Sequence, residues 1–223
     1  MATATHRRAV LPVTEAFTFG QVLVVPVAPA GFRLSHRDDR GLSPSSQSFS
    51  RPEDALEIGR TDDLGSYRPL KTAPNLRHGW RLDIADVPDL YRALDFLYPG
   101  RLAVLHAHQN SRLKVTPLRQ TLDRQTGMYR VAGKITDEQL NQLVGNFCRS
   151  DGGCLRTILW SRDQSGAEPS TKLPSSKYDP DYDQNTAIPA RPSGTGNVPL
   201  LCQESCNLLV AQCRNVVKGT RAE

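Results

Sequence analysis

Four cysteines arranged as two close pairs are the residues of this sequence best suited to chemistry. Cys148 and Cys154 form the first pair, and Cys202 and Cys206 form the second. The polar segment between Cys148 and Cys154 ends in two glycines and can turn both sulfurs toward one point. Residues four apart share a face of a helix, so Cys202 and Cys206 converge if a helix begins near Cys202. Four thiolates gathered in this way can bind zinc or an iron–sulfur cluster.

The same cysteines could instead be small core residues, or they could form two disulfides. The N-terminal residues Met1–Arg8 are polar and basic, and the first apolar run, Val22–Pro29, is short and interrupted by Pro26. This pattern is not that of a secretory signal, so we expect a cytoplasmic chain whose thiols stay reduced. Reduced thiols in close pairs favour a metal centre over disulfides.

Cys213 is the remaining cysteine. It lies seven positions after Cys206, which returns it to the same face of a helix beside Leu209 and Val210. We interpret Cys213 as a packed thiol on the inner face of the last helix. The sequence leaves open the alternative that Cys213 replaces one of the four paired cysteines as a ligand.

The first half of the chain is expected to combine strands with helices. Apolar residues at 21–27 and 31–36 predict two strands joined as a hairpin. Cap residues, apolar stripes and terminating glycines then predict helices over 50–59, 86–98 and 102–109, the first of them beginning with a serine cap.

The second half must position the cysteines. Pro117 is expected in the first turn of a helix that follows Thr116. Thr136 and Gln139 form a capping-box pattern ahead of an apolar stripe, so the helix that begins there should deliver Cys148 at its end.

These elements predict an α+β fold in three parts: a flexible leader at 1–19, a small hairpin and helix module at 20–99, and a mostly helical four-cysteine module at 100–223. Residues 161–198 carry almost no apolar periodicity, which predicts a disordered insert between the two cysteine pairs. A metal centre formed across this insert would close a large loop and anchor the last helix.

Composition restricts the partners. The chain has 223 residues, 38% of them apolar, and a formal charge of +5. The basic residues are interleaved with acidic ones and no aromatic and basic stripe is present, which argues against a nucleic-acid partner. No apolar run is long enough to span a membrane, so we expect no membrane partner.

Several segments resemble a known family. Arg119, residues 124–130, and the two cysteine segments at 148–160 and 202–206 resemble the C-terminal iron–sulfur module of CbiX-type sirohydrochlorin cobaltochelatase-like proteins of the deinococcal type. Residues 32–39 and 67–80 resemble the small stabilising domain that precedes this module.

The resemblance implies a 4Fe–4S cluster bound by Cys148, Cys154, Cys202 and Cys206. Because we find no chelatase domain ahead of the stabilising domain, we expect the isolated chain to lack chelatase activity. The first cysteine pair is also spaced more widely than is usual in these proteins.

Other side chains could support or replace this centre. Guanidinium groups near an anionic cluster would stabilise it and raise its potential, although these arginines could equally lie on solvated helix faces; they are Arg119, Arg124, Arg130 and Arg156. Tyr129 and Trp160 are expected to pack, with shielding of the cluster as the alternative.

The histidines offer no comparable pattern. His106 and His108 would point to opposite sides of a helix and would converge only if their segment is extended. His36 and His78 fall in segments that share no pattern.

Three functions remain. The leading one is an iron–sulfur protein with a redox, sensing or accessory role, linked to tetrapyrrole metal insertion and paired with a separate chelatase or redox protein. The second is a structural zinc module in an interaction protein. A chelatase-like enzyme comes last, because no acid–base constellation is visible.

Overall fold

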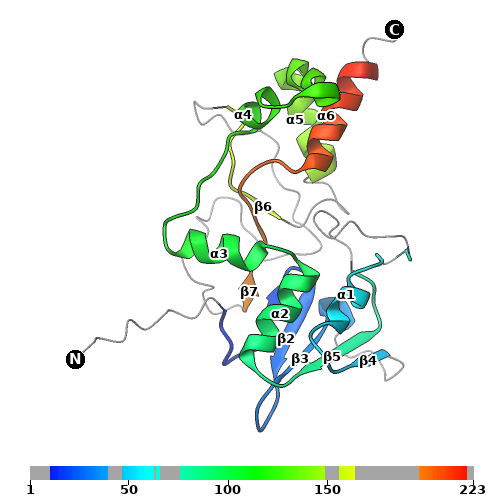
Figure 1. Cartoon of the computed structure of the whole chain (residues 1–223), viewed down its shortest axis with the longest axis vertical. Coiled ribbons are helices and arrows are strands. Elements are labelled where there is room, and N and C mark those ends of the chain that lie inside the picture. The colour runs from blue at the N-terminus through cyan, green and yellow to red at the C-terminus, as the bar shows by residue number, and fades with distance from the viewer. Residues whose placement is uncertain are drawn as a thin grey trace, which may run out of the picture.

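The computed structural model of the chain describes residues 11–39, 47–62, 64–65, 76–148, 156–163 and 196–219. Cys154 and residues 164–195 of the expected insert lie outside these ranges. The described elements separate into a lobe built on a sheet and a lobe of helices, which lie at opposite ends of the molecule in Figure 1.

Six strands of the described residues form one sheet in the order β4-β5-β3-β2-β1-β7. The predicted hairpin is present as β2 and β3, which pair antiparallel with Val24 opposite Leu34. The edge strands β4 and β7 run parallel to their neighbours, and the other pairs are antiparallel. The strands are β1 (Phe17–Phe19), β2 (Val22–Pro26), β3 (Phe32–His36), β4 (Gln47–Phe49), β5 (Trp80–Ile84) and β7 (Asn197–Val198).

Helices α1 (Asp54–Ile58) and α2 (Val87–Leu97) lie on one face of the sheet, and α3 (Arg101–Gln109) follows at its end (Figure 1). Helix α2 begins as predicted, because the Asp86 carboxylate accepts the backbone N–H of Asp89 at 2.9 Å. Helix α1 is shorter than expected: it begins after Glu53 rather than at the predicted serine cap, and Glu53 makes no side-chain cap bond.

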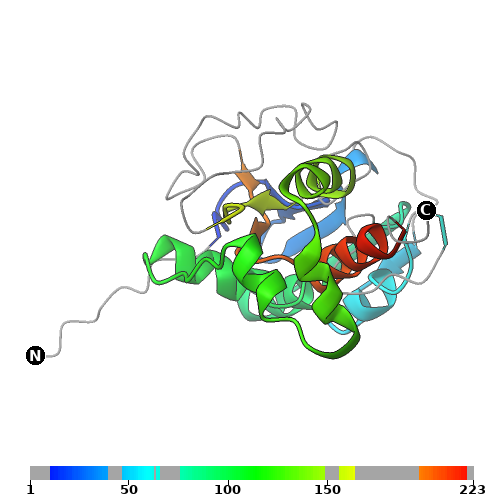
Figure 2. The same ribbon diagram turned by 90° about the horizontal axis from the view of Figure 1, so that it is seen from above.

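The helical lobe contains α4 (Leu118–Asp123), the 3₁₀ helix η2 (Gly127–Lys134), α5 (Asp137–Cys148) and α6 (Asn207–Gly219). Helix α6 packs against α5 and η2, as the view from above also shows (Figure 2). The predicted capping box is confirmed: Thr136 Oγ1 accepts the Gln139 N–H at 3.2 Å, and Gln139 Oε1 accepts the Thr136 N–H at 3.1 Å.

Each lobe has its own hydrophobic core. The core beneath the sheet contains Leu11, Phe17 and Phe19, which fall within the expected leader, so residues 11–19 are an ordered part of the fold. It also contains Val198, Leu200 and Leu201 from the second half of the chain. Asn197 and Val198, placed in the expected insert, form the edge strand β7 beside β1.

A short parallel ladder joins the two lobes. Strand β6 (Thr157–Ile158) pairs with β8 (Leu201–Cys202), and the Arg101 guanidinium at the start of α3 donates to the Leu201 carbonyl at 3.0 Å. The architecture is α+β, as predicted.

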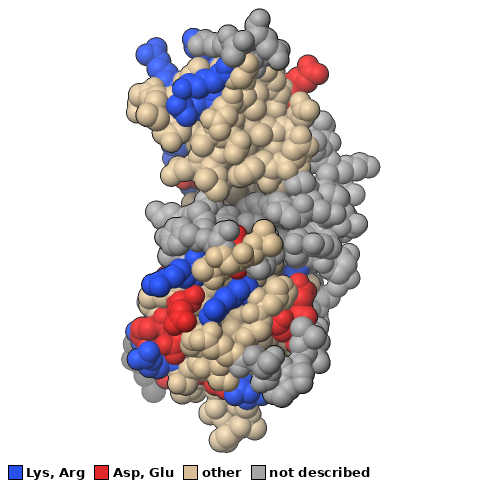
Figure 3. Space-filling view, turned by 90° about the vertical axis from the view of Figure 1, so that its right-hand side faces the viewer, with Lys and Arg blue, Asp and Glu red and all other residues tan. Residues whose placement is uncertain are grey.

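The surface shows no large region of one charge on the face seen in Figure 3. There, basic and acidic side chains of the described residues alternate over the lobe of the sheet, whereas the helical lobe is mainly uncharged. Among the helices of the described ranges, none has the length and apolar content needed to cross a membrane.

Candidate metal centre

Three of the four paired cysteines reach the core of the helical lobe from different elements. Cys148 is the last residue of α5, Cys202 ends β8, and Cys206 immediately precedes α6. Cys148 and Cys202 are buried in this core, and Cys206 is half-buried against it. The condition for placing Cys202 and Cys206 on one helix face is not met, because α6 begins only at Asn207. The fourth cysteine, Cys154, lies outside the described residues.

The position of Cys202 is fixed through both its backbone and its side chain. Its carbonyl accepts the Leu159 N–H at 3.0 Å, which continues the β6–β8 ladder. The indole Nε1–H of Trp160 points at the Cys202 sulfur, with an N···S distance of 3.2 Å. Trp160 is 1% exposed, so this contact is shielded from water. In the thiol form, Cys202 donates to the Glu204 carbonyl at 3.2 Å. A thiolate loses that bond but keeps the donor from Trp160.

Cys206 occupies the N-terminal end of a long helix. Its carbonyl accepts the Val210 N–H at 3.2 Å, which makes it the residue from which α6 starts. The N-terminus of a helix carries a partial positive charge that favours a nearby thiolate. A metal group bound by Cys206 would therefore sit at the N-terminal end of α6.

Cys213 packs as the sequence predicted. It is fully buried on α6, in the same core as Leu209 and Val210. Burial raises the pKa of this thiol from 9.0 to about 12, with the nearby Cys206 adding to the increase. Its full burial among the apolar side chains of α6 fits the packing role.

The spacing of the sulfurs bears on which metal group they fit. Among the cysteines that the structure describes, no three sulfurs all lie within 4.8 Å of one another. A tetrahedral zinc ion with Zn–S bonds of about 2.3 Å would hold its sulfurs about 3.8 Å apart. A 4Fe–4S cube binds each cysteine on a different iron atom, which separates the sulfurs further. The described thiols are therefore not gathered, as a set of three, at the spacing of a single tetrahedral zinc ion.

The four arginines singled out from the sequence have different surroundings. Arg119 pairs with Asp137 and thereby joins α4 to the start of α5. Arg124 lies 3.8 Å from the Glu204 carboxylate, in the loop between Cys202 and Cys206, but both side chains are exposed. Arg130 is exposed on η2, and Arg156 is half-buried next to β6. Arg124 thus contacts the loop between Cys202 and Cys206 through Glu204.

Of the two aromatic residues named from the sequence, Tyr129 and Trp160, one contacts a cysteine and the other has a different partner. Trp160 contacts a cysteine sulfur, whereas Tyr129 is 39% exposed and lies under the Arg214 guanidinium, 5.6 Å from its ring centre. The sequence had identified Trp160 as packing or shielding, but nothing in it indicated a hydrogen bond to Cys202. That bond depends on the β6–β8 pairing, which joins residues more than 40 positions apart.

One pair of histidines lies close together in space and the other does not. His106 and His108 lie on helix α3, so the extended arrangement that would bring them together is not formed. His106 instead contacts Arg112 at 3.3 Å. His36 and His78, which shared no sequence pattern, lie with their rings 3.9 Å apart.

Known proteins match both lobes. Residues 5–109 match the family described as the DR2241 stabilising domain. Residues 110–215 match the 4Fe–4S iron-sulfur cluster binding domain. Both halves of the chain thus match the domains predicted from the sequence.

A solved structure agrees with this result. This chain is similar to the crystal structure of DR2241 from Deinococcus radiodurans, with a TM-score of 0.68 and 28% sequence identity. DR2241 is described as a multi-domain protein that is structurally similar to chelatases and has two additional novel domains. The similarity covers 92% of this chain but only 39% of DR2241. No curated protein sequence matches the chain.

Proposed function

We propose that this chain binds a 4Fe–4S cluster through Cys148, Cys154, Cys202 and Cys206. The observation that carries the proposal is the convergence of three of these cysteines, from α5, β8 and the start of α6, in one core of a domain that matches a cluster-binding family.

A 4Fe–4S cluster supplies one-electron chemistry at a potential set by its surroundings. In this chain the surroundings have three parts. Trp160 donates a hydrogen bond to the Cys202 sulfur, the α6 N-terminus faces Cys206, and the apolar core limits water. Hydrogen bonds to the sulfurs and the helix dipole both stabilise added negative charge, which favours the reduced state.

We further propose a redox, sensing or accessory role in the cytoplasm. The description of DR2241 as similar to chelatases supports a link to tetrapyrrole metal insertion, with a separate chelatase or redox protein as partner.

The test is the metal content of protein purified without oxygen. We expect about four irons and four sulfides per chain and broad visible absorption from sulfur-to-iron transitions. Serine at any one of Cys148, Cys202 or Cys206 should reduce the iron content, because each removes a thiolate ligand.

Cys213→Ser is the matched control, since it changes a buried thiol of the same core without removing a proposed ligand. It should keep its iron. Colourless protein with one zinc per chain would overturn the proposal, and so would loss of iron in the Cys213 variant alone.

A further inference from the structure

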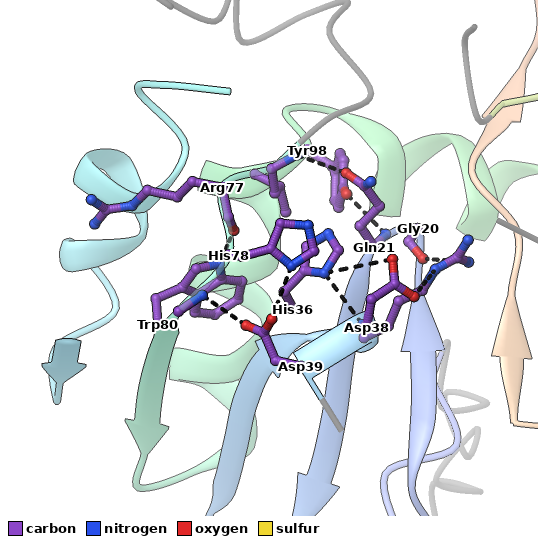
Figure 4. Close-up of polar contacts among 12 residues, drawn as sticks. Gly20, Gln21, His36, Asp38, Asp39, Arg77, His78, Trp80 and Tyr98 are labelled. Carbon is purple, nitrogen blue, oxygen red and sulfur yellow. Dashed lines mark hydrogen bonds and ion pairs between the residues drawn. The ribbon is translucent and has the colours of Figure 1, made fainter. Parts of the chain in front are cut away.

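His36, Asp39 and His78 form a cluster in the lobe of the sheet, away from the cysteines. One ring nitrogen from each histidine and one carboxylate oxygen of Asp39 all lie within 4.8 Å of one another. Figure 4 shows the two imidazole rings side by side with the Asp39 carboxylate beneath them. No other group of three such residues meets this spacing in the part of the chain that the structure describes.

The fold brings these residues together through strand pairing. His36 ends β3, and Asp39 follows it in a short 3₁₀ turn, η1 (Arg37–Asp39). Strand β5 runs antiparallel to β3 with Arg81 opposite Ser35, so the segment that leads into β5 passes the end of β3 and carries His78 there.

The loop that carries His78 is itself held in place. The Leu76 N–H donates to Gln21 Oε1 at 2.7 Å, and the Gly79 N–H donates to Asp39 Oδ2 at 2.8 Å. Trp80, at the start of β5, adds a bond of 2.7 Å from its indole N–H to the Arg77 carbonyl. The cluster is therefore positioned by rigid elements on both sides rather than by one mobile loop.

His36 has a buried polar atom with no partner. Its side chain is 0% exposed, and its Nε2 makes no hydrogen bond. Buried polar atoms are nearly always hydrogen-bonded in folded proteins, because an unpaired one loses its hydrogen bond to water without gaining another and so destabilises the fold. The other ring nitrogen, Nδ1, accepts the Asp38 backbone N–H at 3.3 Å and lies 3.8 Å from the Asp38 carboxylate. This contact orients the ring with its proton on Nε2. To bind a metal through Nε2, His36 would have to move that proton to Nδ1, where the Asp38 carboxylate could accept it.

The local charges favour a cation. Burial, together with the neighbouring His78, lowers the pKa of His36 to about 4, so its imidazole is neutral at pH 7. Asp38 and Asp39 place two carboxylates beside the two rings, and Arg37 is the cation among the groups that act on His36.

We propose that His36, Asp39 and His78 bind a divalent transition-metal ion such as zinc, cobalt or ferrous iron. Two imidazoles and one carboxylate are a donor set that these ions accept. His78 Nδ1 and Asp39 Oδ1 are 2.9 Å apart and hydrogen-bonded, and an ion about 2.05 Å from each atom could replace this bond. A ring nitrogen of His36 would supply the third bond.

The site would hold its ion with open positions. The His78 side chain is 49% exposed and that of Asp39 is 10% exposed, so one side of the cluster faces solvent. Three protein ligands with a free position are typical of sites that exchange water or a substrate, whereas structural zinc sites are closed by four. The ion bound here should therefore be exchangeable, unlike the group held by the four cysteines.

The test is metal binding to the intact protein with its iron–sulfur cluster loaded, so that the paired cysteines are already occupied. Titration with Zn²⁺ in a calorimeter should show one equivalent bound per chain. Titration with Co²⁺ should give visible d–d bands without the near-ultraviolet sulfur-to-cobalt absorption that a cysteine site produces.

His78→Gln is the main variant, because this half-exposed side chain can change with little effect on the core. Asp39→Asn is the second. Both should weaken Zn²⁺ binding by roughly tenfold or more, since each removes one of three ligands. His108→Gln, on helix α3 outside the cluster, is the matched control and should bind as the unchanged protein does. Equal binding by the His78 and His108 variants would overturn the proposal, as would sulfur-to-cobalt absorption.

Discussion

Replacing Trp160 by phenylalanine should lower the reduction potential of the bound cluster. The indole N–H lies 3.2 Å from the Cys202 sulfur in a site that is almost fully buried. Reduction adds negative charge that is shared with the cysteine sulfurs, so a donor to sulfur stabilises the reduced state more than the oxidised one. Phenylalanine keeps an aromatic ring in the core but removes the donor.

The size of the shift follows from the strength of the bond. A hydrogen bond to a charged group contributes about 1.5–3 kcal/mol, and only the part that differs between the two oxidation states changes the potential. If that part is about 1 kcal/mol, the potential falls by about 40 mV, because about 1.4 kcal/mol corresponds to 59 mV for one electron.

The assay is a redox titration followed by electron paramagnetic resonance. Trp80→Phe is the matched control, since Trp80 is equally buried but donates to the Arg77 carbonyl in the other lobe. It should cost stability and leave the potential unchanged. The reasoning is refuted if Trp160→Phe keeps the potential within about 10 mV, or if both variants shift it equally.

Three further predictions concern the fold around the site. Cys213 should resist alkylation at pH 8 until the protein unfolds, because it is buried and has a pKa of about 12. Since that pKa lies above the ordinary 9.0, the stability that the protonated thiol contributes is complete below pH 9 and is lost as the pH rises toward 12. Modification of Cys213 in the native protein at pH 8 would contradict this. Gly196→Ala should lower the free energy of unfolding by about 2 kcal/mol in urea denaturation, because φ is +68° and the new Cβ would lie 2.6 Å from the Ala16 carbonyl oxygen. Gly219→Ala, where nothing lies within 4 Å, is its control, and equal losses would refute the argument. Removing the cluster should speed hydrogen exchange in α6 while β2 and β3 stay protected, and unchanged protection of α6 would show that the cysteines do not anchor it.

The parts of the fold that sequence predicted are those fixed by neighbouring residues. The β2–β3 hairpin, the Asp86 cap and the Thr136–Gln139 capping box each depend on contacts within a few positions, and all three are present. The helix predicted from this capping box is also present, and it ends at Cys148 as predicted.

The parts that sequence missed depend on distant pairing. Cys202 lies in a strand because β8 pairs with β6, and a helical spacing of four could not reveal that ladder. His36 and His78 meet only because β3 and β5 are neighbours, although 42 positions separate the two residues. Strand β7 has two residues, too few to show any periodicity.

Strand β7 also affects how the chain can be made and divided. Because the protein is synthesised from its N-terminus, β1 is made long before Asn197 and Val198, which pair with its outer edge. That edge of β1 therefore has no partner from this sheet until residue 198 has been synthesised. A fragment that stops at residue 109 would keep that edge exposed and would lack Val198, Leu200 and Leu201 from its core. The boundary between the two matched families is therefore not a place where the chain can be cut into two complete folding units.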